Sequence, residues 1–176
     1  MVDIQIRIVE VPDSDFIGAD LRGASLMHLD LTEVNLEATR FERARVVTCA
    51  MEGISFPNAD FHGAILRDTG LADVNWEGAD LRDADLRGAS FHMGSTRSGL
   101  VGSAVPCEGS KTGFYTDDFN DRDFKRPEEI RKANLCGADL RGAILDSVDF
   151  YLVDLRGAKY TREQRAHFVN CGAILS

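Results

Sequence analysis

The chain has 176 residues, a formal net charge of −9 and a hydrophobic content of 44%. That length suits a single domain that buries a core of its own. The acidic balance argues against nucleic acid as a direct partner, because phosphate binding needs a basic surface. The sequence shows neither a signal peptide nor an apolar stretch of roughly 20 residues, so we expect a cytoplasmic protein with no membrane contact.

The N-terminal segment, residues 1–13, predicts a strand. Ile4, Ile6 and Ile8 alternate with polar residues, as side chains do on the two sides of a strand. We expect this segment to cover one end of the domain that follows.

Residues 14–93 carry a repeat with a period of five. A large apolar residue, here called the centre, recurs at every fifth position. A small residue often stands two places before it, Asp or Asn one place before it, and Gly two places after it. This period fits neither a helix nor a strand, so the chain must turn a corner in every repeat, and Gly, Asp and Asn suit such turns. The centres are Phe16, Leu21, Leu26, Leu31, Leu36, Phe41, Val46, Met51, Phe56, Phe61, Leu66, Leu71, Trp76, Leu81, Leu86 and Phe91.

Repeats such as Ala-Asp-Leu-Arg-Gly, at residues 19–23 and 138–142, resemble the pentapeptide-repeat family over roughly residues 14–160. The resemblance implies an all-β fold, a right-handed quadrilateral β-helix with four pentads per coil, whose centres and small residues point inward. Centres twenty residues apart would then stack in four columns, one behind each face of the coil. We call these faces first to fourth, and their opening centres are Phe16, Leu21, Leu26 and Leu31.

The repeat stops after Phe91. Residues 94–117 are rich in Gly and Ser and lack periodicity, which predicts a loop insertion, and a loop of this length is usually functional or disordered. Degenerate pentads over residues 118–124, then a short insertion, then clean pentads up to Tyr160 predict further coils over residues 118–160. The whole chain, residues 1–176, is then one domain of about six coils.

Residues 161–176 predict a C-terminal cap. Thr161 and Gln164 form a capping-box pattern, which indicates a short helix that ends near Gly172 and covers the last coil. The apolar tail at Ile174 and Leu175 leaves two alternatives, a monomer in which the tail packs on this cap or a homodimer through it.

The four cysteines, Cys49, Cys107, Cys136 and Cys171, lack the paired spacing of a metal site, and the four histidines lack ligand spacing. We therefore expect no metal. Without a signal peptide we expect reduced thiols and no disulfide framework. Cys49 stands at an inward position of the repeat and is expected in the core.

The negative charge belongs to the first four coils. Residues 14–93 hold fourteen acidic and seven basic side chains, whereas residues 94–176 hold twelve of each. On the first and fourth faces, which share an edge, no basic residue accompanies the acidic ones, while the other two faces balance. This predicts an acidic edge on the rod, although a charge run also fits a merely solvated face. Its members are Asp15, Asp30, Glu33, Glu37, Glu52, Asp73 and Glu77.

No catalytic constellation or cofactor motif occurs in the sequence, so we expect a protein that binds and does not catalyse. Some members of the family that the chain resembles are DNA mimics. They bind type II topoisomerases such as DNA gyrase and protect them from inhibitors, a form of antibiotic resistance, and in some a protruding loop is needed. The resemblance thus implies gyrase or topoisomerase IV as a partner, and an acidic edge suits a groove that holds phosphates. The second contact would come from the loop residues Leu100, Val101, Val105 and Cys107.

The alternative function is a structural or interaction scaffold for another partner, because a fold alone does not determine function.

Overall fold

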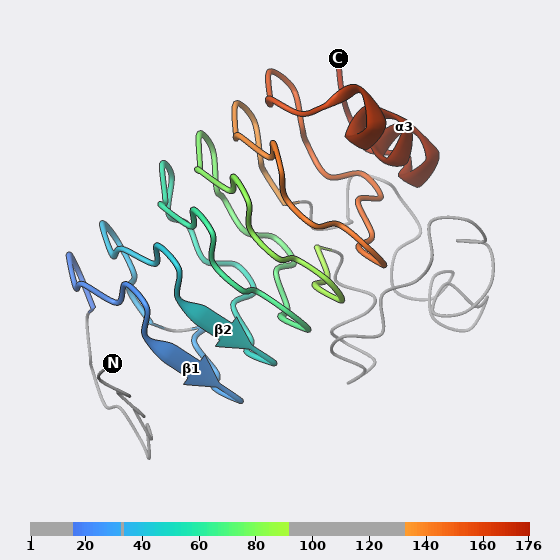
Figure 1. Cartoon of the computed structure of the whole chain (residues 1–176). Coiled ribbons are helices and arrows are strands. Elements are labelled where there is room, and N and C mark those ends of the chain that lie inside the picture. The colour runs from blue at the N-terminus through green and yellow to red at the C-terminus, as the bar shows by residue number, and fades with distance from the viewer. Residues whose placement is uncertain (1–15, 33, 92–132) are drawn as a thin grey trace, which may run out of the picture.

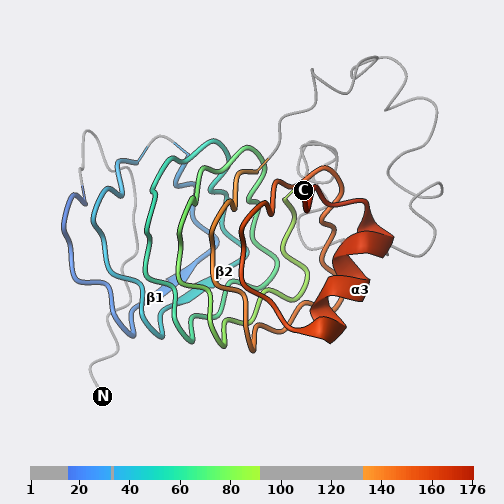
Figure 2. The same cartoon turned by 90° about the horizontal axis from the view of Figure 1, so that it is seen from above.

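The chain winds into a stack of coils that lie side by side along a rod (Figures 1 and 2). A computed structural model describes residues 16–32, 34–91 and 133–176. The described coils follow one another in chain order, and helix α3 lies at the C-terminal end of the stack (Figure 1). Among these residues no helix is both long and apolar enough to cross a membrane.

A parallel hydrogen-bonded ladder joins successive coils. Strand β1 (Ser25–Met27) pairs with strand β2 (Arg45–Val47) in parallel, and Ser25 lies opposite Arg45. Elsewhere single bridges join residues twenty apart, for example Asp60 with Asp80, and among the described residues a longer separation occurs only in the set of bridges that includes Asp80 with Asp139. Only the residues around each centre are extended between two turns, so the ladder consists mainly of single bridges at about the 4.8 Å strand spacing.

Each corner of the coil is a turn, and at many corners a side chain of the turn supports it. The residue two places after the centre has a positive φ, for example 57° at Asp83, a conformation that Gly adopts freely and that Asn and Asp tolerate. At many corners the residue before the centre is Asp or Asn, and its side chain accepts a hydrogen bond from the amide two places on. Asp30 accepts from Thr32 at 3.0 Å, and Asn35 accepts from Glu37 at 3.0 Å. The prediction that these Asp and Asn residues belong to turns is confirmed.

The predicted centres fill the interior. All of them except Phe16 are buried, and Cys49 is only 1% exposed, as its inward position predicts. Aromatic centres of neighbouring coils touch: the ring centroids of Phe41 and Phe61 lie 5.1 Å apart, and those of Phe61 and Trp76 lie 4.5 Å apart. Side chains that recur every five residues therefore build one continuous core.

The coil that contains Trp76 stacks directly on the coil that contains Leu135. The Trp76 amide donates a 2.8 Å hydrogen bond to the carbonyl of Asn134, and Phe91 stacks on Phe150 with centroids 5.3 Å apart. No rung of the described ladder separates these two coils. The pentads predicted over residues 118–124 lie outside the described residues, and the total of about six coils stays a prediction.

Helix α3 (Arg162–Cys171) begins with the predicted capping box. The Gln164 amide donates to Thr161 Oγ1 at 3.2 Å, and the Thr161 amide donates to Gln164 Oε1 at 2.9 Å. The helix ends at Gly172, whose φ is 78°. Phe168 is fully buried and packs on Phe150, with ring centroids 4.7 Å apart. The predicted helix and both of its ends are confirmed.

The chain returns to the ladder after α3. Ile174 pairs with Asp154, and Leu175 packs against the core. Gln164 fastens the helix to the preceding coil, because its Nε2 donates to the carbonyls of Leu140 at 2.7 Å and Ala143 at 3.2 Å. The tail therefore packs on the protein itself, and a homodimer through this cap stays a prediction.

One expectation about the cysteines is wrong. Cys49 and Cys136 are free, but Cys171 is disulfide-bonded. The pairing of two cysteines depends on their distance in the folded chain, which the spacing along the sequence does not reveal. The strand predicted over residues 1–13 and the loop predicted over residues 94–117 lie outside the described residues.

Candidate binding surface

The structure describes only part of the predicted acidic edge. Asp15 and Glu33 lie outside the described residues, as do the four loop residues at positions 100, 101, 105 and 107. From here on, "acidic edge" means the five described members, which are Asp30, Glu37, Glu52, Asp73 and Glu77.

The first face contributes Glu37 and Glu77. Both stand one place after a centre in the same column, two rungs apart, which corresponds to about 10 Å at the usual strand spacing. Both side chains are exposed, and within the described part of the chain neither carboxylate has an ion-pair or hydrogen-bond partner. These two carboxylates are available to a cationic partner.

The fourth face contributes carboxylates in three different states. Asp30 is exposed, and hydrogen bonds from the side chain and amide of Thr32 lower its pKa. Glu52 is half-buried; burial raises its pKa, and the negative charge of Asp30 adds to the effect. Asp73 is half-buried at a corner with φ 59°. The sequence pattern treats these residues as equivalent, but the pKa of Glu52 is raised whereas that of Asp30 is lowered.

Five described carboxylates, three of them on the second face, are neutralised by arginines two places further along the chain. Arg82 Nε donates to Asp80 Oδ1 at 2.9 Å, and Arg82 Nη2 donates to Asp80 Oδ2 at 2.6 Å. These pairs were not predicted, although the recurring tripeptide Asp-Leu-Arg marks every one of them. The pairs are Asp20 with Arg22, Asp80 with Arg82, Asp85 with Arg87, Asp139 with Arg141, and Asp154 with Arg156.

The pairs also set the protonation of their carboxyl groups. The Arg22 side chain, hydrogen-bonded to Asp20, lowers the pKa of Asp20 to about 2. Arg156 lowers the pKa of Asp154 to about 2 in the same way. Asp154 and Arg156 lie on the first face beyond Glu77, so that face becomes neutral towards the C-terminus.

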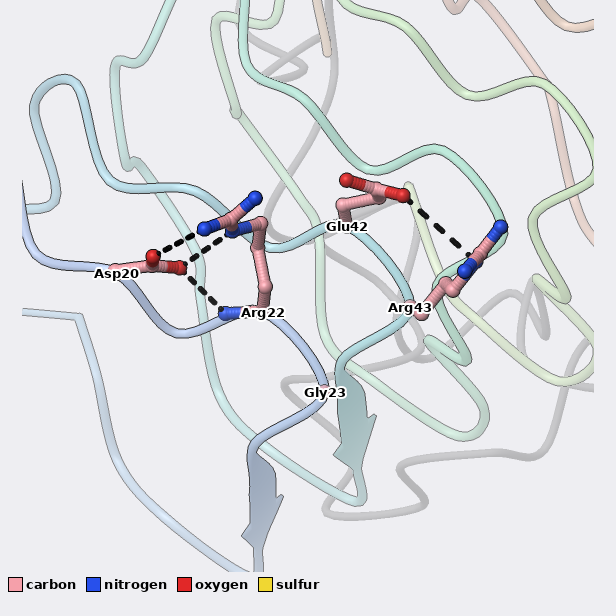
Figure 3. Close-up of a pocket in the computed structure, with 5 residues that line it drawn as sticks. All are labelled: Asp20, Arg22, Gly23, Glu42 and Arg43. Carbon is pink, nitrogen blue, oxygen red and sulfur yellow. Dashed lines mark hydrogen bonds and ion pairs between the residues drawn. The ribbon is translucent and has the colours of Figure 1, made fainter. Parts of the chain in front are cut away.

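Two shallow, open depressions lie on the second face. One is lined by Asp20, Arg22, Gly23, Glu42 and Arg43 (Figure 3). Figure 3 shows Arg22 folded back on Asp20, and Arg43 Nε lies 3.7 Å from Glu42 Oε1. The other depression extends over the later coils and includes five charged side chains, Asp80, Arg82, Asp139, Arg141 and Lys159. Within the described ranges no three His, Cys, Asp or Glu side chains gather as a metal site.

A comparison with family models identifies the repeat. The model described as pentapeptide repeats matches in eight copies, over residues 13–46, 64–94 and 130–159. The chain belongs to the pentapeptide-repeat family. Pentapeptide-repeat proteins adopt a right-handed β-helix, so the predicted family and the solenoid class are confirmed. No curated protein matches this pentapeptide-repeat protein.

Solved structures of other pentapeptide-repeat proteins resemble the chain at low identity. Rfr23 from the cyanobacterium Cyanothece 51142 is 18% identical, with 92% of this chain and 91% of Rfr23 covered and a TM-score of 0.30. HetL from Nostoc sp. strain PCC 7120, involved in heterocyst differentiation regulation, is 20% identical over 94% of this chain and 59% of HetL, with a TM-score of 0.27. QnrB1, a plasmid-mediated fluoroquinolone resistance protein, is 16% identical over 88% of this chain and 83% of QnrB1, with a TM-score of 0.24. Similarity at this level carries no argument about function.

Proposed function

We propose that this pentapeptide-repeat protein acts by binding another protein and not by catalysis. Its acidic edge enters a basic groove of a type II topoisomerase, DNA gyrase or topoisomerase IV, as a mimic of DNA. Such a partner implies the cytoplasmic location that the sequence analysis expects.

The observation that carries the proposal is the contrast between paired and unpaired carboxylates. On the second face the carboxylates of Asp20, Asp80 and Asp139 are neutralised by arginines, whereas Glu37 and Glu77 on the first face are exposed and have no such partner in the described chain. Unpaired surface carboxylates attract cations through the solvent and raise the rate of encounter with a basic surface. A groove built for phosphates offers such a surface.

A supercoiling assay with purified gyrase tests the proposal, with and without a fluoroquinolone and over a range of salt concentrations. The wild-type chain should inhibit supercoiling or protect the enzyme, and the effect should fade with salt because the charges are exposed. The double variant Glu37→Lys, Glu77→Lys should lose most of the effect and keep its melting temperature. The control variant Asp146→Lys, Glu163→Lys makes the same change in net charge away from the acidic edge and should behave as wild type.

Two results would contradict the proposal. If micromolar wild-type protein leaves gyrase and topoisomerase IV unaffected, neither enzyme is the partner. If the control variant loses as much activity as the edge variant, the total charge matters and the acidic edge does not.

A scaffold for a different partner is the second candidate. The observation that favours it is the neutral C-terminal half of the first face, where Arg156 compensates Asp154. A mimic that lay along a DNA groove over its whole length would be acidic throughout. A pull-down with wild type and with the Glu37→Lys, Glu77→Lys variant, compared by mass spectrometry, would identify a partner that needs the acidic edge.

A further inference from the structure

The second face carries charges in a definite order along the rod. The residues one place before the second-face centres form a column, in which the ladder bridges each residue to the one in the next coil. The charges of their side chains along this column are minus, plus, minus, minus, minus, plus. Because neighbouring strands lie about 4.8 Å apart, this column presents a fixed row of charges. Its members, from the first coil onwards, are Asp20, Arg40, Asp60, Asp80, Asp139 and Lys159.

The adjacent corner alternates between bare backbone and protruding side chains. On this face, the position two places after the centre holds a glycine in every second coil. We call each coil's place along the rod its level, and the residues at this position in the first five levels all have positive φ. Arg43 is 75% exposed and belongs to the coil next to that of Gly23, and Figure 3 shows its guanidinium turned towards Glu42. The column reads Gly23, Arg43, Gly63, Asp83 and Gly142.

An antiparallel second copy matches both columns at once when a two-fold axis crosses the face between the levels of Asp60 and Asp80. Asp20 then lies opposite the partner's Lys159, and Arg40 lies opposite the partner's Asp139. In the corner column, Arg43 lies opposite the glycine at 142. Symmetry makes each of these contacts twice.

A third column, formed by the second-face residues one place after the centres, also brings opposite charges together in this register. Glu42 lies opposite the partner's Arg141, another pair of opposite charges. The like-charged meeting is that of Asp60 with the partner's Asp80. Asp20, Asp80 and Asp139 each also bind an arginine of their own chain, which weakens attractive and repulsive contacts alike. Opposite charges therefore outnumber like charges across the face.

Neighbouring registers fit worse. A shift of one level in one direction sets Asp20 against Asp139, and a shift in the other direction sets Arg40 against Lys159. Either shift also sets glycines of the corner column against each other, which leaves gaps. Charge order and side-chain size thus select the same register independently.

We propose that two copies of this chain associate through their second faces, antiparallel, about this axis. Exposed ion pairs are individually weak and are screened by salt, so the dimer is weak and depends on salt concentration. The fourth face lies on the opposite side of the coil and the first face is adjacent, so dimerisation leaves the acidic edge accessible. The proposal stands independently of the gyrase partner.

Charge exchange between two variants provides the test. Arg40→Glu alone sets Glu against the partner's Asp139, and Asp139→Arg alone sets Arg against the partner's Arg40, so each variant should dimerise at least about tenfold more weakly than wild type. An equimolar mixture restores opposite charges at both contacts and should form a heterodimer. Sedimentation velocity of the full chain at about 50 mM and about 500 mM salt measures the association, and Arg45→Glu on the third face is the matched control.

The outcomes are distinct. A monomeric wild-type chain at about 100 µM and low salt would overturn the proposal. So would a wild-type dimer that Arg40→Glu leaves intact, because that dimer would use another surface. If circular dichroism shows that Asp139→Arg unfolds the chain, the pair Glu42→Lys and Arg141→Glu replaces the first pair, and failure of their mixture to associate would also overturn it.

Discussion

The Thr69 hydroxyl donates a 3.0 Å hydrogen bond to the carbonyl of Val46, the centre of a pentad one coil earlier. Cys49 occupies the same inward column one coil before Thr69, and its Sγ lies 3.6 Å from the carbonyl of Leu26. Thr39 also follows this rule, with Oγ1 2.7 Å from the carbonyl of Phe16. At these three positions a small polar residue at the inward position therefore ties its coil to the one before it.

Thr69→Val should remove this tie without changing the size of the side chain. Thr69 is fully buried, so the Val46 carbonyl would lose a donor that water cannot replace. We expect a loss of about 1–3 kcal/mol in the free energy of unfolding, measured with urea. Thr69→Ser keeps the hydroxyl and is the control. Equal stability of the two variants would show that the bond is unimportant.

Gly142→Ala should cost more than Gly23→Ala. Both glycines have positive φ, 78° and 67°, where a Cβ is unfavourable by about 1–2 kcal/mol. A Cβ at Gly23 meets nothing within 4 Å, whereas a Cβ at Gly142 overlaps Oδ1 of Asp83. Thermal unfolding should rank the two variants in that order. Asp83→Gly should rescue Gly142→Ala in a double-mutant cycle, and additive effects would disprove the overlap.

Asp154→Asn should destabilise the protein at neutral pH and lose this effect in acid. The pKa of Asp154 is lowered from 3.8 to about 2 by Arg156, so its ionised form stabilises the fold above about pH 4. That contribution disappears as the pH falls from about 4 to about 2. We expect a difference of about 1 kcal/mol at pH 7, because the pair is partly solvated. Asn can still support the turn, as Asn134 does for Cys136 at 3.0 Å.

Urea unfolding of wild type and Asp154→Asn over a pH series measures this difference. The two stability curves should converge at low pH. A gap that persists at about pH 2 would mean that Asn disturbs the turn itself, and the ion pair would then not explain the effect.

Gln164→Glu should destabilise α3, although Glu is a common residue at this position of a capping box. The carboxylate could still accept from the Thr161 amide, but it has no N–H for the carbonyls of Leu140 and Ala143. Near neutral pH we expect a loss of about 1–3 kcal/mol, measured by urea unfolding. The loss should shrink in acid, where a protonated Glu regains one donor. A variant as stable as wild type would show that the anchor of α3 lies elsewhere.

Much of the fold could be predicted because the place of a residue in the five-residue repeat determines whether its side chain points into the core or outward. A residue at a centre, such as Phe41 or Trp76, is buried wherever it falls along the rod. The capping box at Thr161 was predictable because its two hydrogen bonds lie within four residues of sequence. Both predictions rest on local sequence patterns, the five-residue repeat and the capping box, whose physical cause lies within a few residues.

The charged surface was harder to predict because its chemistry depends on neighbours. The sequence pattern grouped Glu37 with Glu52, yet the first is exposed and the second is half-buried with a raised pKa. The pairing of Asp80 with Arg82 follows from the turn that brings them together, which a count of charges does not show. The disulfide at Cys171 likewise depends on proximity in the fold.

The direct stacking of the Trp76 coil on the Leu135 coil has a consequence for the order of folding. Every described rung outside this junction joins residues twenty apart, so most of the ladder can close by short steps along the chain. The rungs across the junction, such as that from Trp76 to Asn134, instead enclose residues 92–132, and we expect their closure to be the slowest. Doubling the enclosed length would cost only about 0.6 kcal/mol in closure entropy. Evolution can therefore lengthen or shorten the chain at this junction, whereas a single residue added within a pentad would turn its centre out of the core.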